Sequence, residues 1–339
     1  MHKYIGIGLL ALFAGFSSAN QRSVTLVTHD SFNLSKEVVA EFEARQNIKI
    51  AVIKGGDAGA MTNRLILTKQ NPIADVVYGI DNTLLARALA ADILAPYRPK
   101  VANLLEKNLL LDAKWRISPV NYGYVALNYD IAWFAAKKLP LPKTLEDFLK
   151  PEYKGMLVVQ NPATSSPGLA FLLATIKHFG EQKALAWWAA LGRNDLKIAS
   201  GWESAYYSDF SRNGGSRPVV VSYASSPAAE VFYGDGKTAP TANLLLAGSS
   251  FLQIEGVAVL KGAKNPELAQ KVVDFLLEPQ TQKDIPTQMW VYPVRRDVAL
   301  PEVFAFAEKP SKSSNFAPST IAANEKRWVQ AWTKVVLGR

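Results

Sequence analysis

Two segments of the chain repeat one arrangement, in which a short apolar strand is followed by a Ser-Ser-Pro turn and a helix. They read LVVQNPATSSPGLAFL at 157–172 and PVVVSYASSPAA at 218–229. The β-branched runs predict strands, and a proline is tolerated in the first turn of a helix, where its missing N–H costs nothing. A helix that begins there directs free N–H groups and serine hydroxyls toward a small ligand. We expect Ser165 and Ser166 to face such a ligand, unless both turns are ordinary helix caps.

The N-terminal part alternates strands with helices in units of about thirty residues. We expect strands at 24–28, 48–53 and 75–78, with helices at 35–46 and 60–69 between them. This alternation predicts a parallel α/β sheet that is covered on both faces. Ligands of such sheets bind beyond the carboxyl ends of the strands. The polar residues expected to gather at that edge are His29, Asp30, Asp57 and Asp81.

Two long β-like runs, 115–130 and 251–260, are interpreted as crossovers between two α/β lobes with a cleft between them. No Pro-rich or Ser-rich linker separates the halves, so strands rather than a tether would join the lobes. A capping box at 144–147 predicts the start of a further helix. The expected division is 20–121 with 254–290 for lobe 1, and 122–253 with 291–339 for lobe 2.

The first 19 residues have the features of a secretory signal peptide. Lys3 supplies the positive start, 5–16 is apolar, and Ser17-Ser18-Ala19 is a small-residue cleavage site. The apolar run is too short to span a bilayer. We therefore expect export to the periplasm, with cleavage near Ala19–Asn20.

Composition excludes several classes of function. The sequence has no cysteine, which excludes disulfides, thiolate catalysis and a lipid anchor at the cleavage point. It has 3 histidines, which are too scattered for a histidine-based metal site. The net charge of +9 is spread along the chain without basic runs, so we do not expect nucleic-acid binding.

Six motifs together resemble the periplasmic thiamine-binding proteins of ABC transporters. They are HDSF at 29–32, DVVYGIDNTLL at 75–85, NPATSSPG at 161–168, GWESAY at 201–206, SYASSPA at 222–228 and MWVYPV at 289–294. The resemblance covers nearly all of the expected mature chain. It implies a type II periplasmic-binding-protein fold whose two lobes close on thiamine or its phosphate esters and deliver it to a membrane permease. The protein would be a monomer without catalytic activity, cofactor or metal.

Thiamine carries a permanently cationic thiazolium ring, which favours aromatic faces. The resemblance places Trp202, Tyr223 and Trp290 in that role. A carboxylate would balance the charge or accept from the pyrimidine amine, and we expect Asp57, in its glycine-rich loop, to be that carboxylate. The full set of expected ligand-binding residues is Asp57, Ala58, Ser165, Ser166, Trp202, Tyr223, Ala224, Ser225, Ser226 and Trp290. The two tryptophans could instead belong to the core, and Asp57 could only stabilise a turn. Some relatives carry a tyrosine where this chain has Ala229, and Phe232 or Tyr233 would have to compensate.

Two other classes of function remain as alternatives. A thiamine-processing enzyme would need a cysteine nucleophile, and a serine nucleophile would need His29 as its base. Another solute on the same fold is the second alternative. Ferric iron would use clustered tyrosines such as Tyr206 and Tyr207, and a polyamine would need several carboxylates spread along the cleft.

Overall fold

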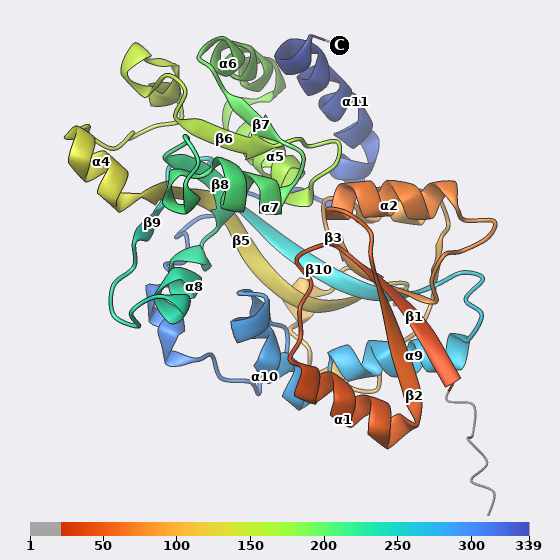
Figure 1. Ribbon diagram of the computed structural model, residues 1–339. Coiled ribbons are helices and arrows are strands. Elements are labelled where there is room, and N and C mark those ends of the chain that lie inside the picture. Colours follow the sequence, from red (N-terminus) through yellow and green to blue (C-terminus); the bar gives the residue numbers. More distant parts are fainter. Residues whose placement is uncertain (1–21, 339) are drawn as a thin grey trace, which may run out of the picture.

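The structure is a computed structural model that describes residues 22–338 (Figure 1). The expected signal segment, 1–19, and the expected first mature residue, Asn20, lie outside the described residues. The strands form one continuous mixed sheet whose main order is β2-β1-β3-β10-β5-β8-β6-β7. Helices cover both faces of this sheet, which confirms the expected α/β class.

The first half of the sheet contains the three N-terminal strands, which are parallel to one another, and an antiparallel β10. Its strands are β1 (Arg22–Thr28), β2 (Ile48–Lys54), β3 (Val76–Asp81), the short β4 (Leu94–Ala95) and β10 (Phe251–Leu260). Its helices are α1 (Lys36–Gln46), α2 (Ala58–Leu67), α3 (Leu85–Ala90), α9 (Pro266–Leu276) and α10 (Pro279–Gln288).

Alternate residues of these strands enter two different cores, because successive side chains of a strand point to opposite faces. Val76 packs with Phe42 of α1 and with α9, whereas Val77 packs with Met61 of α2 and with α3. Strand β3 is therefore buried on both faces, which is why its sequence begins as an apolar run, whereas the edge strand β2 is buried only at Ile48 and Ile50.

The second half repeats this plan with parallel pairing of β6 to β7 and of β6 to β8. Its strands are β5 (Ser118–Asp130), β6 (Leu157–Gln160), β7 (Lys197–Ala199), β8 (Val219–Tyr223) and β9 (Thr241–Leu244). Its helices are α4 (Ile131–Lys137), α5 (Ser166–Phe179), α6 (Glu181–Arg193), α7 (Trp202–Ser204), α8 (Ser226–Tyr233) and α11 (Pro318–Leu337). Helix α5 is buried from Ser166 to Ile176, which explains its almost unbroken apolar sequence.

The two long strands β5 and β10 join the halves, as the sequence predicted. They pair with each other from Val125 opposite Phe251 to Ser118 opposite Val257. Beyond this shared segment β10 pairs with β3, and β5 pairs with β8. Figure 1 shows both strands running through the middle of the molecule.

Short elements complete the chain. They are β11 (Tyr292–Pro293), the 3-10 helices η1 (Ala102–Leu104), η2 (Lys107–Leu109), η3 (Glu146–Leu149), η4 (Pro151–Tyr153), η6 (Ser211–Asn213) and η7 (Glu302–Phe306), and the π-helix η5 (Ala205–Asp209).

The local predictions were wrong in two places. The capping box at 144–147 starts only the single turn η3, because Pro151 disfavours the α conformation at the residue before it and so ends the helical path. Helix α2 begins at Ala58 rather than at the expected residue 60, because the Asp57 carboxylate accepts a hydrogen bond of 2.7 Å from the Ala58 N–H and caps the helix earlier.

Candidate ligand-binding cleft

A cleft of about 1170 Å³ lies between the two halves of the sheet. The first half contributes the loops that follow β1 and β2, and the second half contributes the loops before α5, α7 and α8. Strand β10 and the segment after α10 also line it. These loops lie at carboxyl ends of parallel strands, which is the expected edge for ligand binding in such sheets.

The structure brings together most of the residues that the sequence analysis selected. Those that line the cleft are Asp57, Ala58, Ser166, Trp202, Tyr223, Ser225, Ser226 and Trp290. Ser165 and Ala224 are fully buried and do not line the cleft. Both sit where a strand turns into a helix, so the backbone turn places their side chains in the interior.

Trp202, the first residue of α7, forms one aromatic wall of the cleft. Its ring stacks on Tyr206 at a centroid distance of 5.1 Å and an interplanar angle of 19°. Its indole N–H donates a 2.9 Å hydrogen bond to the hydroxyl of Ser222. Tyr223 lies 6.3 Å away between ring centroids. The indole is thus held on one face and on one edge, with Tyr223 beside it.

Trp290 forms a second aromatic group on the segment after α10. It stacks with Phe304 at 6.0 Å and 11°, and Phe232 and Tyr233 lie at 5.2 and 5.6 Å from it. Its backbone has a φ of 57°, and its carbonyl accepts a hydrogen bond from the hydroxyl of Ser225. Tyr233 also lines the cleft. Tyr233 thus supplies an aromatic ring to the cleft four residues after Ala229 on the same helix, α8 (Ser226–Tyr233).

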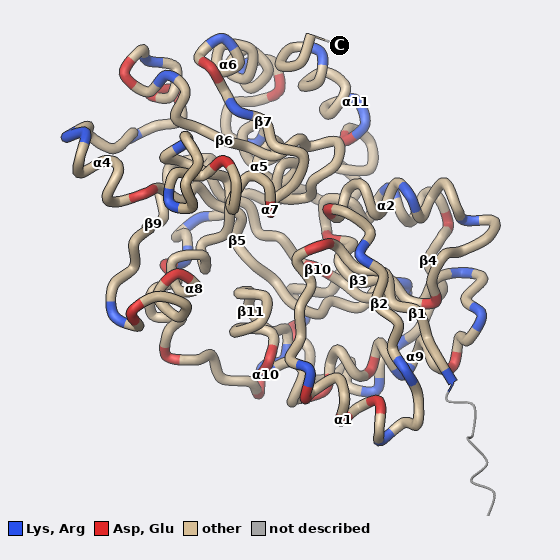
Figure 2. Tube along the Cα trace, in the orientation of Figure 1, with Lys and Arg blue, Asp and Glu red and all other residues tan. Residues whose placement is uncertain are grey.

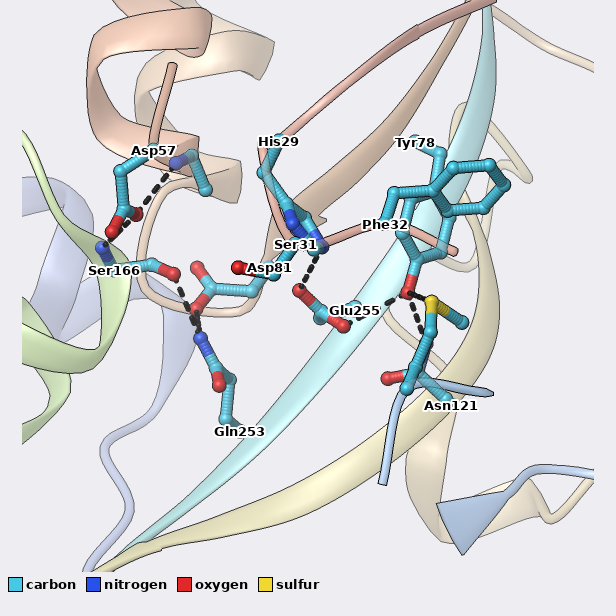
Figure 3. A network of polar contacts seen from close by, with 12 residues as sticks. His29, Ser31, Phe32, Asp57, Tyr78, Asp81, Asn121, Ser166, Gln253 and Glu255 are labelled. Carbon is cyan, nitrogen blue, oxygen red and sulfur yellow. Dashed lines mark hydrogen bonds and ion pairs between the residues drawn. The ribbon is translucent and has the colours of Figure 1, made fainter. Parts of the chain in front are cut away.

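Asp57 connects the two halves across the cleft. Its carboxylate accepts hydrogen bonds from the backbone N–H groups of Ala58 and, at 3.3 Å, of Ser166 (Figure 3). It also accepts one of 2.8 Å from the backbone N–H of Trp202. Burial raises the pKa of Asp57 above its ordinary value, and the hydrogen bond from Trp202 opposes that rise. Most of the acceptor capacity of this carboxylate is therefore used within the protein.

Two further contacts join the same two sides of the cleft. The N–H of Ala60 donates to the carbonyl of Thr164 at 2.9 Å, and the hydroxyl of Ser31 donates to the carboxylate of Glu203 at 3.2 Å. Together with the bonds of Asp57, they hold the loop after β1 and the start of α2 against the loop before α5 and against α7.

A polar network is centred on Glu255 of β10, and of its members the sequence analysis selected only His29. The Nε2 of His29 is 3.2 Å from one Glu255 oxygen, and the hydroxyl of Tyr78 donates to the other at 2.9 Å (Figure 3). Burial alone would lower the pKa of His29, but the negative charge of Glu255 outweighs it and the pKa is raised. Glu255 and Gln253 are polar residues two positions apart in an otherwise apolar strand, and this pattern is the signal that predicts a shared polar face.

Gln253 connects both halves from beneath the cleft. Its amide donates to Asp81 and, at 2.9 Å, to the hydroxyl of Ser166, and its carbonyl accepts from Tyr223 at 2.6 Å. Burial raises the pKa of Asp81 to about 6. Asp81 also accepts hydrogen bonds from the N–H groups of Thr83 and Leu84, so it caps a turn below the cleft and does not line it.

The described residues show no group of three or more His, Cys, Asp or Glu side chains that could hold a metal ion. The two tyrosines considered for iron have different environments. Tyr206 is buried and its hydroxyl donates to Glu230 at 2.8 Å, whereas Tyr207 is exposed. Within residues 22–338, no helix combines the length and the apolar character needed to cross a membrane.

The sequence matches the family of bacterial extracellular solute-binding proteins over residues 71–317. The chain belongs to this family. A relative named thiamine-binding periplasmic protein, from Salmonella typhimurium, is 32% identical, and the match covers 99% of each chain.

Solved structures of solute-binding proteins show the same fold. A periplasmic thiamin binding protein has a TM-score of 0.82 and 31% identity, covering 94% of this chain and 98% of the other. The ferric binding protein from Campylobacter jejuni has a TM-score of 0.73 at 21% identity, covering 92% and 99%. The second likeness concerns the fold alone, since the two sequences have diverged widely. The relatives reported above are all named as binding proteins.

Proposed function

We propose that this solute-binding protein captures thiamine in the cleft between its lobes and delivers it to the permease of an ABC transporter. The observation that carries the proposal is the pairing of aromatic faces with carboxylates around one cleft. The ring faces come from Trp202, Tyr223 and Trp290. Glu255 provides a carboxylate, whose negative charge is complementary to the positive thiazolium. A desolvated cation over such a ring gains roughly 0.5–2 kcal/mol per contact.

The thiamine-binding relatives support this assignment through their names and their full-length similarity. We propose the ten residues selected from the sequence as the ligand-binding set, with Ser165 and Ala224 acting through the backbone. Glu255 joins the set as a second carboxylate beside the cation. Its oxygens contact His29 and the Tyr78 hydroxyl, whereas those of Asp57 accept from backbone N–H groups, so both carboxylates act mainly through their charge.

We propose hinge closure as the mechanism, with lobes at 20–121 plus 254–290 and 122–253 plus 291–339. The two long strands would carry the hinge. After β5 and β10, the chain passes between the lobes a third time near residue 290. Because Val291 and Val294 pack in the core of the first half, this passage lies a few residues later than 290. Ligand that bridges both lobes stabilises the closed form, and the closed form is recognised by the permease.

Periplasmic location, a monomeric state and the lack of catalysis complete the proposal. The relatives named as periplasmic proteins and the signal-like sequence at 1–19 support export. A thiolate mechanism is excluded because the sequence contains no cysteine.

Thermal unfolding with and without ligand tests the function. Ligand at about a hundred times its dissociation constant stabilises the folded state by roughly 2.7 kcal/mol. We expect thiamine to raise the melting temperature, while spermidine and ferric iron do not. A shift with spermidine or iron and none with thiamine would assign the cleft to another solute.

A further inference from the structure

We propose that the first half of the molecule docks on an anionic phospholipid surface through the end that lies away from the cleft. This end, which we call the basic end, is formed by the end of α2 and by the loops that follow α2, α3 and β10. None of the residues that line its cavity lines the cleft. The inference goes beyond the proposed function and does not depend on which solute the cleft holds.

A cavity of about 540 Å³ lies at the basic end. Three of the side chains that line it, those of Leu65, Ile93 and Leu260, are apolar and buried. Strand β10 lines the cleft at Glu255 and this cavity at Leu260, and it pairs with β3 between these positions. The cavity therefore lies at the opposite end of β3 from the cleft.

The charged residues that line this cavity are Lys69, Lys261, Lys264 and Asp92. Lys261 pairs with Asp92 at 2.5 Å. Within the described residues 22–338, Lys69 and Lys264 form no ion pair, and the Nζ of Lys69 lies 3.5 Å from the carbonyl oxygen of Ala91. Packing thus brings together two lysines from distant parts of the sequence and leaves both without a carboxylate partner.

Leu67, the last residue of α2, lies at the same end. Its exposed fraction of 86% is the highest among the large apolar residues that the structure describes. Arg64, three residues earlier, is also exposed, and residues three apart share one face of a helix. Figure 2 shows basic residues, in blue, along α2 and in the segments near β4. The basic end therefore combines a protruding leucine with several cations.

An anionic phospholipid surface is complementary to both of these features. Its negative potential attracts lysine and arginine side chains that come within a Debye length. An apolar side chain that reaches the boundary between head groups and acyl chains adds affinity because it leaves water. A free phosphate ion would use the lysines but not Leu67, and an apolar protein surface would use Leu67 but not the lysines. The combination therefore favours lipid, and the cleft stays clear of the membrane contact.

Co-sedimentation of the purified protein with vesicles tests the inference. One set of vesicles contains equal parts of phosphatidylglycerol and phosphatidylcholine, and the other contains phosphatidylcholine alone. We expect binding to the first set that weakens as ionic strength rises, and binding to the second that is at least about tenfold weaker. Equal binding to both sets, or no binding to the phosphatidylglycerol vesicles, overturns the inference.

The double variant Lys69→Gln, Lys264→Gln removes the two unpaired charges. We expect its partition coefficient onto phosphatidylglycerol vesicles to fall at least about tenfold. The matched control is Lys137→Gln, Lys183→Gln, because both lysines are exposed on helices of the second half and the change in net charge is the same. The control should bind as wild type does. An equal loss in both double variants would assign the attraction to net charge alone and overturn the docking surface.

The variant Leu67→Ser tests the apolar contact. We expect its partition coefficient to fall at least about threefold. Leu300→Ser, at an exposed leucine that lines neither the cavity nor the cleft, should leave it unchanged. Wild-type binding by Leu67→Ser, with binding lost in the Lys69 and Lys264 double variant, would assign the surface to an anion without an apolar part and overturn the lipid assignment.

Calorimetric titration with thiamine separates this inference from the proposed function. None of the residues changed in these variants lines the cleft, so every variant should bind thiamine as wild type does. If wild type binds the vesicles but not thiamine, the proposed function fails and the docking surface stands. If it binds thiamine but not the vesicles, the docking surface fails and the proposed function stands.

Discussion

The carboxylate of Asp57 accepts a hydrogen bond of 2.8 Å from the backbone N–H of Trp202, 145 residues away in the sequence. One residue caps α2 in the first half of the sheet, and the other begins α7 in the second. The bond therefore links the cap of one helix to the aromatic wall of the cleft. Any change in the distance between the halves must stretch or break it.

Replacement of Gly201 by alanine should keep the loop before α7 apart from Asp57 at the start of α2. A Cβ at this position would lie 2.9 Å from Oδ2 of Asp57 and 3.1 Å from its Cβ, closer than packed atoms allow. We expect Gly201→Ala to bind thiamine at least about tenfold more weakly in calorimetry, a loss of about 1.4 kcal/mol.

Gly192→Ala is the control for this variant, because in α6 the nearest atom to the added Cβ is the Val336 carbonyl oxygen at 4.0 Å. It should leave binding unchanged and raise the free energy of unfolding by up to about 1 kcal/mol through helix propensity. Unaltered affinity in Gly201→Ala would show that the two sides of the cleft need not approach this closely.

Removal of the Trp202 ring should weaken binding without unfolding the protein. The ring is held by Tyr206 and Ser222 but remains partly accessible in the cleft. We expect Trp202→Ala to lose roughly 2 kcal/mol or more of binding free energy, as buried aromatic hot spots do. Trp133→Ala on α4, outside the cleft, should affect only stability. Affinity equal to wild type in Trp202→Ala would remove this residue from the ligand site.

The buried Asp81 should make stability fall as pH rises. Its folded pKa of about 6 exceeds the ordinary 3.8, so the folded state binds more protons between these values. The difference of about two units corresponds to roughly 3 kcal/mol, which is lost as pH rises through the folded pKa. Urea unfolding from about pH 4 to pH 7 should therefore show a smaller loss of stability in Asp81→Asn than in wild type.

The contribution of Asp147 to stability should depend on pH in the opposite direction to that of Asp81. Its pKa is lowered to about 2 by hydrogen bonds from Lys150 and the backbone N–H groups of Lys143 and Thr144. Its contribution is present above its unfolded pKa and disappears as pH falls through the folded value. Parallel pH profiles for wild type and Asp81→Asn would contradict the proposed proton uptake by Asp81.

Protonation of His29 should oppose the binding of a cation. Burial lowers its pKa, Glu255 and Asp57 raise it, and the net shift is upward from 6.5. A proton on His29 places a positive charge in the cleft, so thiamine affinity should fall by roughly tenfold between about pH 8 and pH 5.5. The variant His29→Gln should bind with a flatter pH profile. An equally steep profile in His29→Gln would assign the pH dependence to another group.

Local patterns predicted most of the elements that form the cleft. Strand β6, helix α5 and the long strands β5 and β10 were expected from apolar runs, a serine cap position and Pro167. These signals are local, because the spacing of apolar residues and the preferences of turn residues depend on only a few neighbours in the sequence. The polar face of β10 was equally visible in the alternation of Gln253 and Glu255, but its partners were not.

The sequence by itself determined the alternation of strands and helices, the polar loops at their carboxyl ends and the aromatic residues that those loops carry. Only the tertiary structure decided which lone pairs and protons remain for a ligand. Asp57 accepts from Trp202, Ser166 accepts from Gln253, and Ser225 donates to Trp290. The partners in these pairs are separated by 145, 87 and 65 residues. Hydrogen bonds of this kind depend on how distant segments pack, and no local pattern specifies that packing.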